Sequence, residues 1–171
     1  MKQVNFLEKK SFAYGGALLK KRKARLHARP LTTKATMHLV LRSSQARGEY
    51  SLLQKEHKLI IDNVFRKFSK IHAVKILKLV NVSNHLHLEV KLGRRASWRP
   101  FIGAVTGAIA LKIGKGKLKR FWDRRPFTRI LRSFRERIIL RKYFELNELE
   151  ALGMNRLNAR FFLASKSQRQ I

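Results

Sequence analysis

Two neighbouring stretches of the sequence, 74–82 and 85–92, constrain the fold of this chain more than any other feature. Both are short, rich in apolar and β-branched residues, and separated only by the dipeptide Ser-Asn, which is the spacing of a tight β-hairpin. The second stretch reads "HLHLEVKL", and successive side chains on a strand point to opposite faces. His85 and His87 therefore share one face of the predicted strand, close enough to hold one ion, while the apolar side chains occupy the other face.

The rest of the chain places this hairpin in a recognisable order of elements. The hydrophobic periodicity predicts a strand at 36–44, a helix at 49–73, the two hairpin strands, a helix at 97–114, a loop with a fourth strand at 114–131, and a helix at 133–153. The order β, α, β, β, α, β, α is that of a ferredoxin-like βαββαβ antiparallel sheet with an appended C-terminal helix. We therefore expect an α+β fold with helices on one face of the sheet and the other face, or its cover, available for chemistry.

The charge of the chain indicates its partner. The 171 residues include 40 Lys and Arg against 10 Asp and Glu, a net charge of +30 that would strain a compact fold by self-repulsion unless a polyanion neutralises it. We expect nucleic acid to be that polyanion, bound in a strongly salt-dependent manner. A small, basic chain is equally typical of a ribosomal or nucleoid protein, so charge alone does not identify an enzyme.

Two absences narrow the classes of protein further. The chain has no cysteine, which excludes a disulfide framework and a thiolate zinc site. It has no apolar stretch long enough to span a membrane and no apolar core of a signal peptide near its start. A soluble, cytoplasmic protein without a membrane partner is the resulting expectation.

The basic residues divide the chain into three parts. We expect a basic N-terminal arm at 1–34, one domain at 35–155 and a basic C-terminal tail at 156–171. The arm is interpreted either as a DNA-contacting segment or as a solvated tail. The residues predicted to contact DNA lie in the arm and in a glycine-containing loop: Lys20, Lys21, Arg22, Lys23, Arg25, Lys115, Lys117, Lys119, Arg120, Arg124 and Arg125.

The last predicted helix carries a second pair of polar residues. Tyr143 and Asn147 lie one helical turn apart, so both project from the same face. Combined with His85 and His87, they form a candidate site for cleaving a phosphodiester. The Tyr143 oxygen would attack phosphorus as a covalent nucleophile, and a divalent ion held by the two imidazoles and the Asn147 carbonyl oxygen would polarise the phosphate.

Each part of this candidate site has a structural alternative. A His-x-His strand is often a pair of partly exposed polar residues, and a helical tyrosine often packs its ring at the edge of a core. Trp98, Trp122 and Phe121 are interpreted either as platforms for unpaired bases or as core residues, and core packing is favoured for both tryptophans. His38 would be a sheet neighbour of the histidine pair.

Three motifs together resemble a known family. The segment "SNHLHLEV" resembles the His-hydrophobe-His strand of the HUH nucleases, and "KYFELNELEA" resembles the Tyr-x-x-x-Asn helix of the single-tyrosine transposases that contain an IS200-like domain. The intervening "FWDRRPFTRIL" is similar to the basic, Trp-bearing strand that often precedes this helix in the REP-associated tyrosine transposases. The resemblance spans residues 36 to 153 in the family's own order.

The resemblance implies a role for each matching residue. His85 and His87 would bind Mg²⁺ or Mn²⁺, Asn147 would be the third ligand, and Tyr143 would become joined to the 5′-phosphate of cut single-stranded DNA. The partner would be single-stranded or hairpin DNA, and the protein, a monomer or homodimer, would act in the bacterial cytoplasm in association with the nucleoid. No ATP would be required, because the phosphotyrosine bond conserves the energy of the broken one.

The sequence also departs from the REP-associated pattern. Glu148 follows the asparagine where proline is common, and Val82-Ser83 stands where Met-Pro is common. The rival hypothesis is a protein that binds nucleic acid without cutting it, either a transposase descendant or a ferredoxin-like RNA-binding protein. RNA-binding proteins of this fold carry stacking aromatics on their central strands, whereas the central strand here carries histidines.

Overall fold

The computed structural model of the chain describes residues 29–118, 120–123 and 125–168. The elements follow in the order β1 (Met37–Arg42), α1 (Lys55–Ile71), β2 (Val74–Asn81), β3 (His85–Leu92), α2 (Trp98–Gly114), β4 (Phe127–Ile130), α3 (Phe134–Ala151) and α4 (Arg156–Gln168). Two 3-10 turns, Gly48–Tyr50 and Arg95–Ser97, precede α1 and α2. The predicted α+β order is confirmed, and α4 is an additional helix in the segment expected only to be a basic tail.

The four strands form one antiparallel sheet in the order β2-β3-β1-β4. The β2–β3 hairpin turns through Ser83 and Asn84, and the N–H of Val82 donates to the carbonyl oxygen of His85 at 2.9 Å. Ser83 adopts a φ of 61°, the left-handed conformation that a tight hairpin turn requires. The two edges of the sheet are β4, which has only four residues, and β2, whose pairing is interrupted by a bulge between Ile76 and Lys78.

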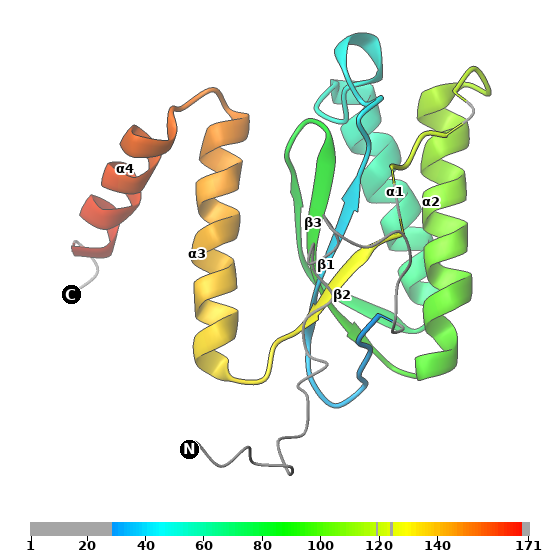
Figure 1. The fold of residues 1–171 in the computed structure, drawn as a ribbon, viewed down its shortest axis with the longest axis horizontal. Coiled ribbons are helices and arrows are strands. Elements are labelled where there is room, and N and C mark those ends of the chain that lie inside the picture. The colour runs from blue at the N-terminus through cyan, green and yellow to red at the C-terminus, as the bar shows by residue number, and fades with distance from the viewer. Residues whose placement is uncertain (1–28, 119, 124, 169–171) are drawn as a thin grey trace, which may run out of the picture.

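The sheet separates two unequal layers (Figure 1). Helices α1 and α2 cover one face, where the main core gathers the apolar side chains of β1, β3 and α2, including Leu39, Leu88 and Phe101. Helix α3 covers the opposite face, and its Leu140 and Phe144 form a smaller core with Val80 and Leu131. The histidine-bearing face of β3 is therefore covered by the helix that carries Tyr143, as the expected arrangement requires.

Charged side chains join α3 to the sheet. The carboxylate of Glu89, fully buried on β3, accepts from Arg137 Nε at 2.7 Å and from Arg141 Nε at 3.5 Å. Lys78 on β2 forms a further ion pair with Glu148 at 2.8 Å. These contacts lie along the length of α3. Together with the apolar contacts of the helix, they fix its position over the sheet.

The start of α3 is stabilised by its own sequence. Ser133 is the N-cap residue, and its hydroxyl accepts from the backbone N–H of Glu136 at 3.1 Å. The Glu136 carboxylate in turn accepts from the N–H of Arg132 at 2.7 Å. This reciprocal arrangement resembles a capping box and satisfies backbone donors that a helix start leaves unpaired.

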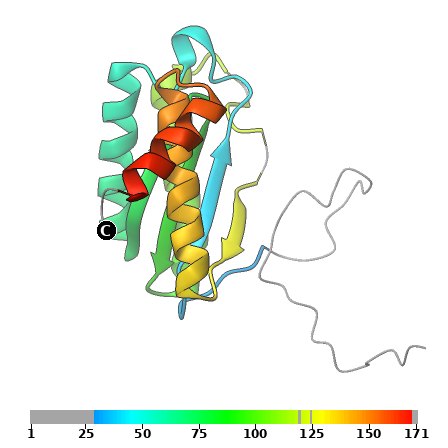
Figure 2. The ribbon, with the colours of Figure 1, turned by 90° about the vertical axis from the view of Figure 1, so that its left-hand side faces the viewer.

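The C-terminal segment packs as a helix on the outer side of α3 (Figures 1 and 2). Ala159 is buried in this contact, whereas Leu157, Phe161 and Phe162 of α4 remain exposed. At the other end of the chain, residues 29–34 lie against the domain, and Thr128 Oγ1 donates to the carbonyl oxygen of Pro30 at 2.9 Å. None of the described helices combines the length and apolar composition needed to cross a membrane.

Candidate active site

The two histidines of β3 lie on the face of the sheet that α3 covers. His85 and His87 are two residues apart on the strand, and their ring centroids are 4.7 Å apart with the rings nearly perpendicular. The intervening Leu86 is fully buried on the opposite face, in the main core. Strand alternation thus places both imidazoles at one location, as the sequence pattern predicts.

His87 is held by a third histidine from the neighbouring strand. Nε2 of His38, on β1, lies 3.0 Å from Nδ1 of His87 in a buried hydrogen bond. The other ring nitrogen of His87, Nε2, is buried and has no hydrogen-bond partner among the described residues. When His87 Nδ1 donates to His38, the unpartnered Nε2 carries a lone pair, which is what a metal ligand requires.

His85 is oriented by its neighbour in the hairpin turn. Its Nδ1 lies 2.6 Å from Oδ1 of Asn84. An amide oxygen can only accept, so Nδ1 of His85 donates, and the Nε2 of the neutral ring keeps its lone pair. The turn residue therefore sets the tautomer that would be needed for His85 to bind an ion through Nε2.

Burial keeps these imidazoles uncharged. Burial, with smaller effects from His85 and His38, lowers the pKa of His87 to about 3. Burial followed by the charge of Arg129 lowers the pKa of His38 to about 4. The pKa of His85 is also lowered, by burial and then by the charge of Arg42. Neutral rings at neutral pH are the forms that can bind a metal ion.

Tyr143 lies against the histidines from the opposite side of the site. Its ring centroid is 5.4 Å from that of His87 and 6.3 Å from that of His38, in edge-on arrangements. The residue is 36% exposed, so part of it is open to solvent. The structure thus brings together a phenol from α3 and imidazoles from two strands that are more than fifty residues away in the chain.

Asn147 lies one turn further along α3 and is buried. Its Nδ2 donates to the backbone carbonyl oxygen of Tyr143 at 2.9 Å. This bond uses the amide nitrogen as a donor. The lone pairs of the amide oxygen, Oδ1, are not used by it and can bind another partner. The arrangement suits the predicted use of the Asn147 oxygen as a ligand.

These residues fit a divalent ion by their chemistry. Within the described residues, no three His, Cys, Asp or Glu side chains gather as ligands of one ion, so the donor set would be two imidazoles and one amide oxygen. Nitrogen and oxygen donors of this kind suit several divalent ions. Nε2 of His87 is buried and has no hydrogen-bond partner among the described residues, so this nitrogen is available as a ligand of an ion.

Two residues of this site have a larger role than the sequence pattern predicts. His38 is expected only as a sheet neighbour but is hydrogen-bonded to His87, and Glu89, for which the motifs predict no role, pairs with Arg137. Glu89 continues the polar alternation of His85 and His87 along β3, and that regular spacing was the available signal. The pairing of His38 with His87 joins residues 49 apart in the chain, which sequence periodicity does not register.

The predicted DNA-contacting residues are only partly within the described structure. Lys20, Lys21, Arg22, Lys23, Arg25, Lys119 and Arg124 lie outside the described residues. The side chains of Lys115, Lys117, Arg120 and Arg125 are exposed. The loop that contains them returns to the sheet where the N–H of Asp123 donates to the carbonyl oxygen of Arg42, and Arg42 pairs with His85 across the sheet.

The two tryptophans have mainly structural surroundings, as the sequence analysis favoured. Trp98 is 9% exposed and belongs to the main core. Trp122 packs against this core, and its Nε1 donates to the carbonyl oxygen of Thr106 at 2.9 Å. Phe121 is buried as well.

Comparisons with known proteins bear on the family and the fold of this chain. The model of the family described as "Transposase IS200 like" matches residues 32–150. The chain is similar to the solved structure of a REP-associated tyrosine transposase bound to a REP hairpin, with 16% identity, a TM-score of 0.59 and 74% of each chain covered. It is also similar to a protein from Deinococcus radiodurans R1 described as a candidate transposase, with 18% identity, a TM-score of 0.46, and 74% of this chain and 97% of that chain covered. No curated protein sequence matches the chain.

Proposed function

This chain belongs to the IS200-like transposase family, and on that premise we propose that it is a metal-dependent transposase that nicks and rejoins single-stranded DNA through a 5′-phosphotyrosine intermediate. The observation that carries the proposal is the contact between the Tyr143 ring and His87, whose Nε2 is buried without a partner among the described residues. A nucleophile and a prospective metal ligand thus lie on facing elements, with their rings in edge-on contact. The alternative structural role, a tyrosine that only fills a core edge, leaves the unpartnered nitrogen without explanation.

The chemistry assigned to Tyr143 is a transesterification. Its oxygen forms a bond to phosphorus, and the bond from phosphorus to O3′ of the preceding nucleotide breaks. The electron pair leaves with O3′, which takes a proton and becomes a free 3′-hydroxyl, while the phenol proton is lost to solvent. The reverse attack by a 3′-hydroxyl rejoins the strand, so that no nucleotide triphosphate is needed.

The surrounding residues support this reaction by binding and orientation. His85, His87 and Asn147 would hold Mg²⁺ or Mn²⁺, which when bound supplies a Lewis acid that stabilises the charge developing on the phosphate. Asn84 and His38 orient the two imidazoles. Arg42 and Arg129, whose charges lower the pKa values of His85 and His38, add positive potential that attracts the phosphates of the strand.

The partner and setting follow from the same proposal. The structural relative was solved with a REP hairpin, and we assign single-stranded or hairpin DNA to this chain as well, bound with the help of the basic arm at 1–34. The protein would work as a monomer or homodimer on DNA of the bacterial nucleoid, in the cytoplasm. The domain would comprise residues 35–155, with the basic segment 156–171 following it.

The decisive experiment is the capture of a covalent adduct. Incubated with a hairpin-flanked single-stranded oligonucleotide and Mn²⁺, the protein should form a species that survives denaturing electrophoresis, because a phosphotyrosine ester persists when other contacts are lost. Tyr143→Phe should abolish the adduct while DNA binding is retained, and Tyr50→Phe is the matched control that should retain both. EDTA and His87→Ala should each prevent adduct formation. Binding without any adduct, across metals and hairpins, would favour the rival protein that binds DNA without cutting it.

A further inference from the structure

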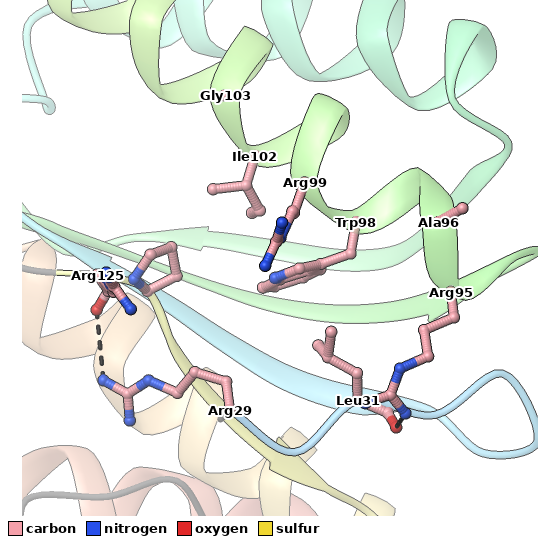
Figure 3. Close-up of a pocket in the computed structure, with 10 residues that line it drawn as sticks. Arg29, Leu31, Arg95, Ala96, Trp98, Arg99, Ile102, Gly103 and Arg125 are labelled. Atoms are coloured by element: carbon pink, nitrogen blue, oxygen red, sulfur yellow. Dashed lines mark hydrogen bonds between the residues drawn. The ribbon is translucent and has the colours of Figure 1, made fainter. Parts of the chain in front are cut away.

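A cavity of about 830 Å³ lies at the β4 edge of the sheet, apart from the histidines (Figure 3). Three segments form it: residues 29–31, the start of α2 with the turn before it, and the dipeptide Arg125-Pro126 that precedes β4. Its volume is in the range of small-molecule and nucleotide sites. The phosphodiester chemistry proposed above makes no use of it.

The charged part of the cavity is made by arginines alone. Arg29, Arg95, Arg99 and Arg125 line it, and no acidic side chain does. Arg95 donates to the carbonyl oxygen of Leu31 at 3.2 Å, and Arg29 donates to that of Arg125 at 3.4 Å, so two of the arginines also hold the walls together. Several guanidinium groups without a carboxylate among them match a phosphate group, which accepts their planar N–H donors.

Arg99 is the arginine best placed to bind a ligand. It lies in the first turn of α2, which contains no acidic residue, and its side chain is exposed. Its side chain forms no hydrogen bond or ion pair with other residues in the described part of the chain. Figure 3 shows its guanidinium group pointing into the cavity beside Trp98. All its donors therefore remain for a ligand.

The remaining wall of the cavity is apolar. Leu31, Trp98, Ile102 and Pro126 contribute to it. A simple polyanion would contact only the arginines and leave the apolar wall unused. An apolar ligand would contact only the apolar wall and leave the arginines unused. A nucleotide has both parts, because its base packs against aromatic and aliphatic side chains while its phosphate binds arginine.

A single aromatic ring connects the cavity to the catalytic face. The guanidinium carbon of Arg29 lies 5.9 Å from the centroid of the Phe127 ring. The His38 ring lies 5.8 Å from the same Phe127 ring, edge-on. Phe127 begins β4 directly after Pro126, so the cavity and the histidine-bearing face meet at the start of this edge strand.

We propose that this cavity binds one unpaired nucleotide of the DNA strand that Tyr143 cleaves, with its base against Trp98 and its phosphate on Arg99 and Arg125. The identity of the strand rests on the proposed function. The binding itself does not, because it requires no metal ion and no reaction at Tyr143. The cavity would set the position of the cut by holding the strand at a fixed distance from the nucleophile.

The test uses Trp98 as its own reporter. The chain has two tryptophans, so Trp122→Phe leaves Trp98 as the only one in the full-length protein. Titration with an unlabelled oligothymidine in EDTA should quench Trp98 fluorescence, because a base bound in the cavity would lie against the part of the indole that lines it. If Trp122→Phe folds poorly, fluorescence anisotropy with a labelled oligothymidine measures the affinity of the unmodified protein, which has both tryptophans.

A matched pair of double variants separates the cavity from general charge. Arg99→Gln with Arg125→Gln should weaken binding of the single strand by about tenfold or more. Lys58→Gln with Arg66→Gln removes the same charge from exposed positions of α1 and should weaken binding much less. Unchanged Trp98 fluorescence, equal losses of affinity in the two double variants, or equally strong quenching by a duplex would each overturn the proposal.

The outcome for the cavity can be distinguished from the outcome for the proposed function. At saturating hairpin DNA with Mn²⁺, the Arg99→Gln/Arg125→Gln protein should still form the Tyr143 adduct, with altered placement of the cut. Quenching of Trp98 without any adduct in the unmodified protein would leave the cavity intact and reject the cleavage chemistry. An adduct whose cut position is unchanged in the Arg99→Gln/Arg125→Gln protein, together with no quenching of Trp98, would support the cleavage chemistry and reject the cavity as a nucleotide site.

Discussion

Nε2 of His38 lies 3.0 Å from Nδ1 of His87, so that a histidine on β1 determines how a histidine on β3 presents its other nitrogen. Both rings are buried and stacked, with centroids 5.3 Å apart. The hydrogen bond fixes the orientation of the His87 ring and leaves Nε2 as its other nitrogen, and the Asn84 oxygen selects the tautomer of His85 with Nε2 unprotonated. The prospective metal site is therefore oriented before any ion arrives, which lowers the cost of binding one.

Removing this orientation should weaken metal binding. In His38→Ala, the His87 ring loses its hydrogen-bond partner, and we expect the affinity for Mn²⁺ to fall by about 10- to 100-fold. Isothermal titration with Mn²⁺ measures the change, and adduct formation should recover when the Mn²⁺ concentration is raised. His72→Ala, which alters a histidine outside the site, is the control. Equal Mn²⁺ affinities for His38→Ala and the unmodified protein would show that His38 does not orient His87.

Glu89 should be important for the stability of the fold and for the position of α3. Glu89→Gln keeps the shape of the side chain but leaves Arg137 and Arg141 without their buried anion, and we expect the free energy of unfolding to fall by about 1–3 kcal/mol. Urea denaturation followed by circular dichroism measures it. Glu150→Gln, which breaks the more exposed pair with Arg156, should cost less than about 1 kcal/mol. Similar losses in the two variants would contradict the role given to Glu89.

The buried histidines should make the metal-free protein sensitive to acid. In the unfolded chain imidazoles take up protons near pH 6.5, whereas in the folded protein the pKa is about 4 for His38 and about 3 for His87. Between these values the unfolded state binds more protons, so the free energy of unfolding should fall as the pH decreases from 6.5 towards 4. Urea denaturation in EDTA at several pH values measures the slope. His38→Phe should flatten it, and an identical slope in that variant would assign the acid sensitivity to other groups.

The N-terminal arm should act through its charge. Residues 29–34 lie against the domain, so the informative deletion is 1–28, which removes cations without removing the Pro30 contact to Thr128. We expect weaker DNA binding and a smaller salt slope, while the Tyr143 adduct still forms at high DNA concentration. Binding measured from about 50 to 300 mM salt provides the slope. A deletion that leaves the slope unchanged would show that the arm does not contact the DNA backbone.

Local patterns predicted the elements of this fold accurately because periodicity is a local property. The strand predicted at 85–92 is β3, and the helix predicted at 97–114 is α2 apart from its first residue. Helix α4 was missed because its residues were interpreted only by their charge, although Asn155 carries a cap signal and its Oδ1 accepts from the N–H of Asn158.

The parts that the sequence did not predict depend on contacts between distant residues. The pairing of Glu89 with Arg137 spans 48 residues, and the hydrogen bond from Arg29 to Arg125 spans 96. No periodic pattern encodes such distances. The roles of His85, His87, Tyr143 and Asn147 came from motif spacing and remain predictions, whereas the shared location of the imidazoles and the phenol is a feature of the folded chain.

The short β4 and the bulged β2 at the edges of the sheet limit how copies of this chain can join when they are crowded along a polyanion. A polycation concentrates along nucleic acid, and crowded β-proteins can fuse when the open edge of one sheet adds a strand to another. Here one edge offers the four residues of β4, and the other is interrupted by the bulge between Ile76 and Lys78. Within the described residues, neither edge presents a long uninterrupted strand, so the sheet is a poor template for a strand added by a neighbouring copy.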